Sequence, residues 1–299
     1  MSIYAGIDVG GTSIKMGLFE DGTLIEKWSI KTRTEDCGAH VLSDIYDSLF
    51  EHIEAGQIEA IGIGLPGPVE DDRIVHGLVN IGWGEVDVKE ASKPYVSCPV
   101  YAINDANAAA LGEVMAGGAM GKRSAVMITI GTGIGGGIVI EDRLVIGARG
   151  AAGEIGHMPL VFEGGEYDTL EERAGALGIK RRTLKLIEEG IYKTSLELDF
   201  EVRDVFDLAK TGDELCVKVV DEMSVCLGTA LSDIACLIDP EVFVIGGGVA
   251  DAGDFLLDKI RKVYVERAFG PCKETKIVIA GLGNDAGIYG ACKYAMGKE

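Results

Sequence analysis

The chain has 299 residues, of which 47% are apolar and 25% charged, so it can bury one or two cores and is neither disordered nor fibrous. Its formal net charge of −20 disfavours nucleic acid and anionic membranes as partners, because both would be repelled. Seven cysteines without a C-x-x-C pair, no signal-peptide pattern after Met1 and no apolar run of membrane-spanning length predict a protein of the reducing cytoplasm.

The first part of the chain predicts strands interrupted by glycine and proline. Short runs of β-forming apolar residues predict strands, and apolar positions on one face between Gly38 and Ala55 predict a helix. Pro66-Gly67-Pro68 ends the fourth strand, because proline has no N–H to donate to a sheet. The predicted elements are strands over 4–9, 14–19, 23–30 and 58–65 and a helix within 38–55.

Residues 69–99 show little periodicity, and the glycine-flanked Trp83 is their one marked feature. Trp83 could be a sugar-binding platform or a cover for the core, and composition favours the cover. A strand is predicted over 100–103, followed by an alanine-rich helix after Asp105. Gly117-Gly118 then breaks the chain. We expect a smaller lobe of residues 1–116, joined by a C-terminal helix over 285–299, and a larger lobe of residues 117–284.

The second half repeats the opening pattern of strand, glycine turn and strand, which suggests an ancient duplication. Strands over 125–130 and 138–140 flank a turn at 131–137. A long helix over 215–238 ends at Asp239-Pro240. Further strands are predicted over 242–245 and 276–282, and helices over 254–269 and 286–296. Strands that alternate with helices favour an α/β architecture.

Three glycine turns are candidate phosphate sites. The first glycine turn is Gly10-Gly11-Thr12, the second glycine turn is Gly131-Thr132-Gly133, and the third glycine turn is Gly246-Gly247-Gly248. Glycine lets several backbone N–H groups converge on one phosphate. Asp8 and Lys15 flank the first glycine turn, and they supply an acid that can hold hydrated magnesium and a base that can meet phosphate.

Two other nucleotide motifs fit less well. The run from Gly131 to Gly136 satisfies the dinucleotide pattern G-x-G-x-x-G, but a strand follows it, so a bound pyrophosphate would lack the helix N-terminus that it needs. A Walker-type loop is absent, because Gly121-Lys122 is followed by Arg123 and no glycine lies five residues before Gly121.

Three polar groups permit both a structural and a functional interpretation. Asp105 follows a predicted strand and opens a helix, where it can act as the N-cap and stay ionised. His157 lies near Glu154 in the glycine-rich sequence Gly-Glu-Ile-Gly-His of residues 153–157. Glu171 opens a helical segment over 170–179, where an acid is also a favourable first-turn charge.

Together these residues resemble the ROK family of sugar kinases, within the actin-like, hexokinase-like ATPases. Asp8-Val9-Gly10-Gly11-Thr12 with Lys15 is similar to the family's first phosphate motif, and residues 131–137 are similar to its second. Ile245-Gly246-Gly247-Gly248-Val249 resembles the adenosine segment, and Asn104-Asp105-Ala106-Asn107 resembles the catalytic motif. Gly153-Glu154-Ile155-Gly156-His157 is similar to the family's sugar-binding loop and is called the sugar loop below. The resemblance covers essentially the whole chain in the expected order.

The resemblance implies an α/β, two-lobed actin-like ATPase (ribonuclease H-like) fold with duplicated strand-turn-strand phosphate motifs. ATP and Mg²⁺ would bind at the glycine turns, with the Mg²⁺ near Asp8 and Asp105. Asp105 would be the general base for a sugar hydroxyl, most simply O6. The implied sugar ligands are Gly67, Asn80, Asn104, Asp105, Glu154, His157 and Glu171.

One segment departs from the family pattern. Typical members hold a structural zinc with one histidine and three cysteines after the sugar loop, but residues 158–170 contain no cysteine. A tetrahedral zinc site needs four ligands, so we expect no structural zinc. The segment is also shorter than usual, which leaves the shape of the sugar pocket open.

The resemblance predicts an ATP-dependent hexose kinase, with glucose as the first candidate substrate. Kinases for N-acetylmannosamine or a β-glucoside, and polyphosphate as the phosphoryl donor, stay open. The family also contains sugar-responsive repressors with an N-terminal helix-turn-helix domain; the first motif begins at Asp8, and we expect no such domain here. The family further implies a cytoplasmic homodimer and closure on sugar binding.

Overall fold

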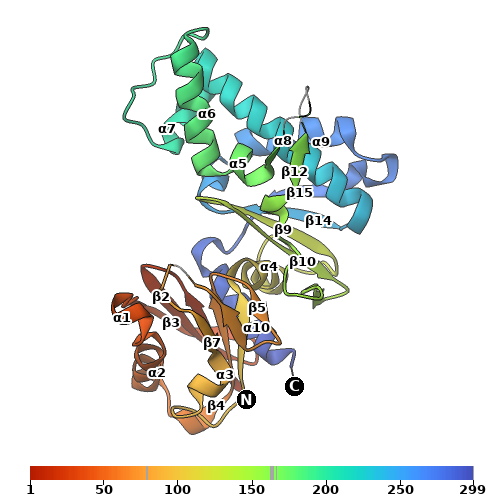
Figure 1. Cartoon of the computed structure of the whole chain (residues 1–299). Helices are drawn as coiled ribbons and strands as arrows, with labels where there is room; N and C mark the ends of the chain where they lie inside the picture. The colour runs from red at the N-terminus through yellow and green to blue at the C-terminus, as the bar shows by residue number, and fades with distance from the viewer. Residues whose placement is uncertain (79, 162–164, 166, 299) are drawn as a thin grey trace. The chain divides into compact units, whose positions relative to one another are not determined.

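The computed structural model describes residues 1–78, 80–161, 165 and 167–298. Two compact units make up the chain, coloured by residue number in Figure 1. The first unit holds Met1–Arg123, Gly137–Gly153 and Gly281–Glu299, and the second holds Ser124–Gly136 and Glu154–Ala280. The lobe boundaries expected from the sequence stay a prediction. No helix in the described part of the chain is long and apolar enough to cross a membrane.

A five-stranded sheet of order β3-β2-β1-β4-β8 forms the centre of the first unit. β1, β2 and β3 are antiparallel neighbours, whereas β1, β4 and β8 run parallel. The strands are β1 Ile3–Val9, β2 Ser13–Glu20, β3 Thr23–Lys31, β4 Ile58–Leu65 and β8 Val100–Asn104. All five lie within a residue of the predicted ranges. The residues of β1, β2, β4 and β8 are largely buried, whereas β3, at the edge of the sheet, is mostly exposed.

Helices cover this sheet, and the C-terminal helix lies closest to it. α10 (Ala286–Met296) contacts β1, β4 and α4 (Asp105–Ala116). Glycines permit this close approach: a Cβ on Gly6 would lie 2.0 Å from the carbonyl oxygen of Ile288, and one on Gly62 would lie 1.9 Å from that of Ala291. The remaining helices of this unit are α1 Glu35–Gly38, α2 Val41–His52 and α3 Val88–Ser92, with 3-10 turns η1 Ala55–Gln57 and η5 Gly283–Asp285.

The second unit contains the strands β10-β9-β14-β15 in that order. β9 (Ala125–Ile130) and β15 (Lys276–Ile279) each run parallel to β14 (Val242–Gly246). α8 (Glu214–Ile238) and α9 (Asp254–Arg267) pack on each other in this unit (Figure 1). The other elements are α5 Leu170–Ala174, α6 Ala176–Glu189, α7 Val202–Lys210, β12 Pro159–Val161, β13 Tyr167–Thr169, η2 Ile155–His157, η3 Gly248–Ala252 and η4 Gly270–Glu274.

The two sheets support the predicted duplication. Each begins with a strand, a glycine turn and a strand, and in each the first strand pairs with a later parallel strand. β10 (Ile134–Ile140) is where the chain leaves the second unit, and its last residues pair with β11 (Arg143–Leu144) in the first. The chain is therefore mixed α/β, with the same strand, turn and strand pattern in both sheets.

Several predicted boundaries were wrong, and glycine explains two of them. β10 begins at Ile134 rather than at residue 138, because Gly135, Gly136 and Gly137 continue the strand instead of the turn. The helical segment expected over 170–179 divides at Gly175, which is extended with φ −72° and ψ 161°. The strand expected over 276–282 ends at Ile279.

Other elements escaped the periodicity analysis. Residues 69–99 form a small sheet of β5 Val69–Glu70, β6 Ile74–His76 and β7 Glu85–Asp87 before α3. The strands are too short to show a clear period. Trp83 covers the core as favoured: it is 8% exposed, and its indole N–H donates to the Gly38 carbonyl oxygen at 2.9 Å.

Candidate active site

The first glycine turn is fixed by hydrogen bonds from its own end and from the end of β3. The Gly10 N–H donates to the Ser13 carbonyl oxygen at 3.0 Å. The buried Thr32 donates its hydroxyl to the Gly10 carbonyl oxygen at 2.6 Å and its N–H to the Thr12 carbonyl oxygen at 3.0 Å. The turn is therefore closed before any ligand arrives, and Thr32 holds it although no sequence motif marked that residue.

Asp8 and Lys15 form a charged pair beside this turn. They are register partners on β1 and β2, with 3.8 Å between the Lys15 Nζ and an Asp8 carboxylate oxygen. Burial raises the pKa of the Asp8 carboxyl, and the Lys15 ammonium opposes that rise. Gly287 of α10 leaves room for the carboxylate, since a Cβ there would lie 2.5 Å from the Asp8 Cγ. The pair predicted from the sequence is thus held against the start of a helix.

Asp105 lies at the first turn of α4, and Asn104, not Asp105, is the N-cap. Asn104 has an extended backbone, and its Oδ1 accepts the Asn107 N–H at 3.0 Å. The Asp105 Oδ1 accepts the Ala106 N–H at 2.8 Å and the Asn104 Nδ2 at 3.1 Å. The expected capping role of Asp105 was wrong, because only the preceding residue has the non-helical geometry of a cap. Two donors instead orient the Asp105 carboxylate.

Two more predicted sugar ligands lie near these groups in the first unit. The Gly67 carbonyl oxygen accepts the Asn104 Nδ2 at 3.2 Å. Asn80 is exposed and lies against the first glycine turn, since a Cβ on Gly11 would be 3.6 Å from the Cβ of Asn80. The first unit therefore places Asn104, Asp105 and Gly67 in one hydrogen-bonded group and Asn80 beside the first glycine turn.

The second and third glycine turns lie side by side in the second unit. Gly247 has φ +81°, and a Cβ there would lie 2.5 Å from the carbonyl oxygen of Ile130, at the end of β9. A pocket of about 560 Å³ joins the two turns. Its lining is Gly131, Thr132, Ala176, Val202, Arg203, Phe206, Asp207, Lys210, Gly248, Val249, Asp251 and Ala252.

One wall of this pocket comes from α7, an element that the sequence analysis missed. Phe206 and Val202 supply apolar surface, while Arg203 and Lys210 both contact Asp207, at 3.6 Å and 3.2 Å. The spacing of Val202, Val205, Phe206 and Ala209 is that of a helical face, and this signal was available in the sequence. An apolar wall opposite glycine turns suits the flat base of a nucleotide.

The sugar loop residues are accessible in the second unit. Glu154 precedes η2 and His157 is its last residue, with 4.0 Å between a Glu154 carboxylate oxygen and the His157 Nε2, and both side chains are exposed. Gly156 packs on the start of β10, because a Cβ there would lie 2.2 Å from the Ile134 carbonyl oxygen. Glu171 also reaches this strand: its Oε2 accepts the Ile134 N–H at 2.8 Å. The second unit thus brings Glu154, His157 and Glu171 to the strand that follows the second glycine turn.

The segment without cysteines forms a hairpin in its described part. β12 and β13 pair antiparallel, and Leu170 donates its N–H to the Met158 carbonyl oxygen at 2.9 Å. Phe162, Glu163, Gly164 and Glu166 lie outside the described residues. The expectation that no zinc binds here stays a prediction.

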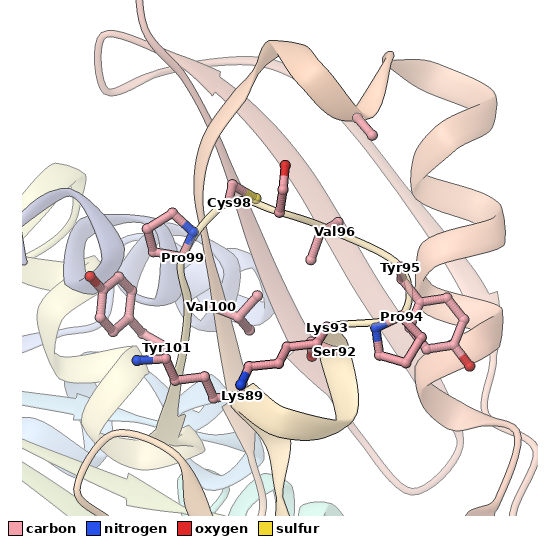
Figure 2. Close-up of a pocket in the computed structure, with 12 residues that line it drawn as sticks. Lys89, Ser92, Lys93, Pro94, Tyr95, Val96, Cys98, Pro99, Val100 and Tyr101 are labelled. Carbon is pink, nitrogen blue, oxygen red and sulfur yellow. The ribbon is translucent and has the colours of Figure 1, made fainter.

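A larger pocket, of about 820 Å³, lies elsewhere in the first unit (Figure 2). Lys89, Lys93, Tyr95 and Tyr101 contribute to its lining, and Lys93 pairs with Glu90 at 2.6 Å. None of the predicted site residues lines this pocket. Volume alone therefore does not identify the active site, and the glycine turns with their polar neighbours are the better guide.

Comparisons with known proteins show the family of the chain. The ROK family model matches residues 4–298. A glucokinase of Halalkalibacterium halodurans is 38% identical over 96% of this chain and 93% of its own length. A ROK family glucokinase structure from Streptomyces griseus, in complex with glucose and AMPPNP, is 31% identical with a TM-score of 0.77, over 99% of this chain and 100% of its own. A ROK hexokinase structure from Thermus thermophilus is 30% identical with a TM-score of 0.83, over 99% and 98%.

These matches, together with the paired sheets and the glycine turns, define an ATP-dependent sugar kinase that acts on a hexose and has the actin-like ATPase fold. The chain belongs to the ROK family, whose model spans nearly its whole length.

Proposed function

We propose that this kinase transfers the γ-phosphoryl group of ATP to the O6 hydroxyl of glucose, with Asp105 as the general base. The observation that carries the proposal is the position of Asp105, which opens α4 with its Oδ1 held by the Asn104 amide and the Ala106 N–H. A carboxylate oriented in this way can accept a proton within hydrogen-bond reach of a bound hydroxyl.

The chemical step needs one proton transfer and one displacement. The sugar oxygen attacks the γ-phosphorus while its proton moves to the Asp105 carboxylate. The bond between the γ-phosphorus and the bridging oxygen breaks, so that ADP leaves and a sugar phosphomonoester forms. Since phosphoryl transfer depends mainly on positioning and charge stabilisation, the rate depends on how firmly both substrates are held.

Six further residues are the proposed sugar contacts. Asn104, Gly67 and Asn80 are the candidates in the first unit, where the Asn104 amide already contacts the Gly67 carbonyl oxygen and Asp105. Glu154, His157 and Glu171 are the candidates in the second. Carboxylates, amides and an imidazole supply the donors and acceptors that sugar hydroxyls need.

ATP is proposed to bind through its phosphates to the glycine turns and through its base to the pocket beside α7. Lys15 would meet a phosphate oxygen. Among the described residues, no group of three or more His, Cys, Asp or Glu side chains could hold a metal by itself. Because Mg²⁺ commonly uses one or two carboxylates with substrate phosphates and water, the half-buried Asp8 carboxylate fits a magnesium ion that arrives with ATP.

A coupled assay of ADP release tests the proposal. Purified protein with ATP and Mg²⁺ is screened against glucose, N-acetylmannosamine, other hexoses and β-glucosides, and against polyphosphate as donor. Glucose is expected to give the highest kcat/KM. A higher value for N-acetylmannosamine or a β-glucoside would replace glucose as the substrate, and no turnover with any sugar would overturn the proposal.

We further propose a homodimer in the cytoplasm, which rests on the family resemblance alone. Light scattering coupled to size-exclusion chromatography measures the oligomeric state. A mass of one chain, 31.6 kDa, would contradict the dimer.

A further inference from the structure

Glu171 makes a contact that sugar binding does not require. Its Oε2 accepts the Ile134 N–H at 2.8 Å, directly after the second glycine turn. Gly133, the last residue of that turn, leaves space for the carboxylate, since a Cβ there would lie 2.1 Å from Oε2. Charge-assisted bonds of this kind are stronger than neutral ones. The carboxylate therefore fastens one end of the turn.

The start of α6, directly after Gly175, holds the rest of the same turn. The Ala176 N–H donates to the Gly131 carbonyl oxygen at 2.9 Å, and the Leu177 N–H donates to the Thr132 carbonyl oxygen at 3.4 Å. A Cβ on Gly175 would lie 3.3 Å from the Thr132 carbonyl oxygen. The bend between α5 and α6 thus wraps the second glycine turn, and Glu171 is the side chain that it contributes.

The position of Glu171 is set by its neighbours on both sides. Thr169 and Glu172 form a capping box at the start of α5, in which the Thr169 Oγ1 accepts the Glu172 N–H at 3.2 Å. Arg173 contacts the Asp168 carboxylate at 2.5 Å. These interactions fix the first turn of α5 against β13, so the Glu171 carboxylate is already in place in the free protein.

We propose that Glu171 is a positioning residue for the second glycine turn and thereby sets nucleotide affinity, in addition to any contact with sugar. This inference rests on the proposed function, because that turn lines the proposed nucleotide pocket. One carboxylate then serves both substrates: it holds Ile134 through Oε2 and stands beside the residues of the sugar loop that pack on the same strand. A sugar that contacts Glu171 would therefore change the position of the second glycine turn through the hydrogen bond between Glu171 and Ile134.

The decisive measurement is nucleotide affinity without sugar, because a residue that only contacts sugar would leave it unchanged. Isothermal titration with AMPPNP and Mg²⁺ compares the wild-type protein with Glu171→Asp, Glu171→Gln and Gly133→Ala. Glu171→Asp shortens the side chain by one methylene, and Gly133→Ala displaces the carboxylate. Both are expected to raise the Kd about tenfold, the scale of one charge-assisted hydrogen bond. Glu171→Gln keeps an acceptor and is expected to have a smaller effect.

Glu188→Gln is the matched control, since it removes the same charge from an exposed position on α6. Its AMPPNP affinity is expected to equal that of the wild type, and thermal unfolding checks that every variant is folded. Unchanged AMPPNP affinity in Glu171→Asp and Gly133→Ala, with a raised KM for sugar, would overturn the inference and leave the kinase proposal standing. Failure of the wild type both to bind AMPPNP and to turn over any sugar would overturn both.

Discussion

The first and second glycine turns follow equivalent strands of two similar sheets, yet they are held in different ways. In the first unit, the strands themselves supply the charged pair Asp8 and Lys15, and Thr32 at the end of β3 closes the turn. In the second unit, the groups that hold the turn come from α5 and α6, through Glu171 and the Ala176 N–H.

The different ways of holding the two turns suggest that the two similar sheets have different roles, one in catalysis and one in nucleotide binding. The first turn has a cation and an acid within its own motif, which suits phosphate and magnesium. The strands beside the second glycine turn, β9 and β10, contain neither a cation nor an acid. Its shape depends on the bend between α5 and α6, and α7 forms an apolar wall of the adjoining pocket. We therefore expect substitutions in the first unit to affect catalysis and those around the second turn to affect nucleotide binding.

Asp105→Asn should give the largest effect and separate these tasks most clearly. The amide cannot accept the sugar proton, so kcat is expected to fall by about two to four orders of magnitude. AMPPNP affinity should stay near the wild-type value, because Asp105 is not among the residues that line the proposed nucleotide pocket. Asp233→Asn, which changes an exposed aspartate on α8, serves as the control. Near-normal turnover in Asp105→Asn would remove Asp105 from the role of base.

Glu113→Ala should be the most destabilising change in the first unit. The Glu113 side chain is 0% exposed, and its carboxylate accepts the N–H groups of Gly118, Gly281 and Leu282 at 2.6, 2.8 and 2.9 Å. Removal takes the acceptor from three part-buried N–H groups, at a cost of about 2 kcal/mol. Chemical denaturation measures this loss. A change below about 1 kcal/mol would show that water replaces the carboxylate.

Thr32→Val tests the first glycine turn itself. Valine has the shape of threonine but cannot donate to the Gly10 carbonyl oxygen, so we expect a loss of about 1 kcal/mol in unfolding free energy and a lowered kcat. Thr23→Val, at the exposed opposite end of β3, is the matched control. If both variants behave alike in denaturation and kinetics, the hydroxyl of Thr32 does not hold the turn.

The smallest effect is expected from the ion pair between α6 and α8. Arg182 donates to both carboxylate oxygens of Glu222, at 2.6 and 2.9 Å. Burial tends to raise the pKa of the Glu222 carboxyl, but Arg182 and Lys218 outweigh it and hold the pKa below its usual 4.5. The stabilisation is therefore present above pH 4.5 and is lost as pH falls through the lower folded value.

Glu222→Gln should accordingly lower the free energy of unfolding at pH 7 by about 1 kcal/mol or less. The difference from the wild type should shrink as the pH is lowered below 4.5. Denaturant titrations from pH 7 down to acid conditions measure it. A difference that stays constant across this range would mean that the carboxylate is not responsible.

The sequence predicted most of the fold and the position of Asp8 and Lys15 beside the first glycine turn, because these signals are local. Buried apolar runs marked the strands, and Asp8 and Lys15 lie inside the motif of the first glycine turn. Thr32 and Glu171 act on turns many residues away, so no spacing rule connects either residue with its partner. The break at Gly175 was missed because glycine is tolerated in helices, and α7 because its 9 residues give only a short run of helical period.

The most direct test of the account is the identity of the phosphorylated product. Wild-type protein is incubated with ATP, Mg²⁺ and ¹³C-labelled glucose, and the product is examined by ³¹P and ¹³C NMR, with Asp105→Asn in parallel. We predict a phosphomonoester whose phosphorus couples to C6, formed by the wild type and almost undetectable in the variant. Folded wild-type protein that binds AMPPNP but forms no sugar phosphate, or a variant that forms it at the wild-type rate, would contradict the account.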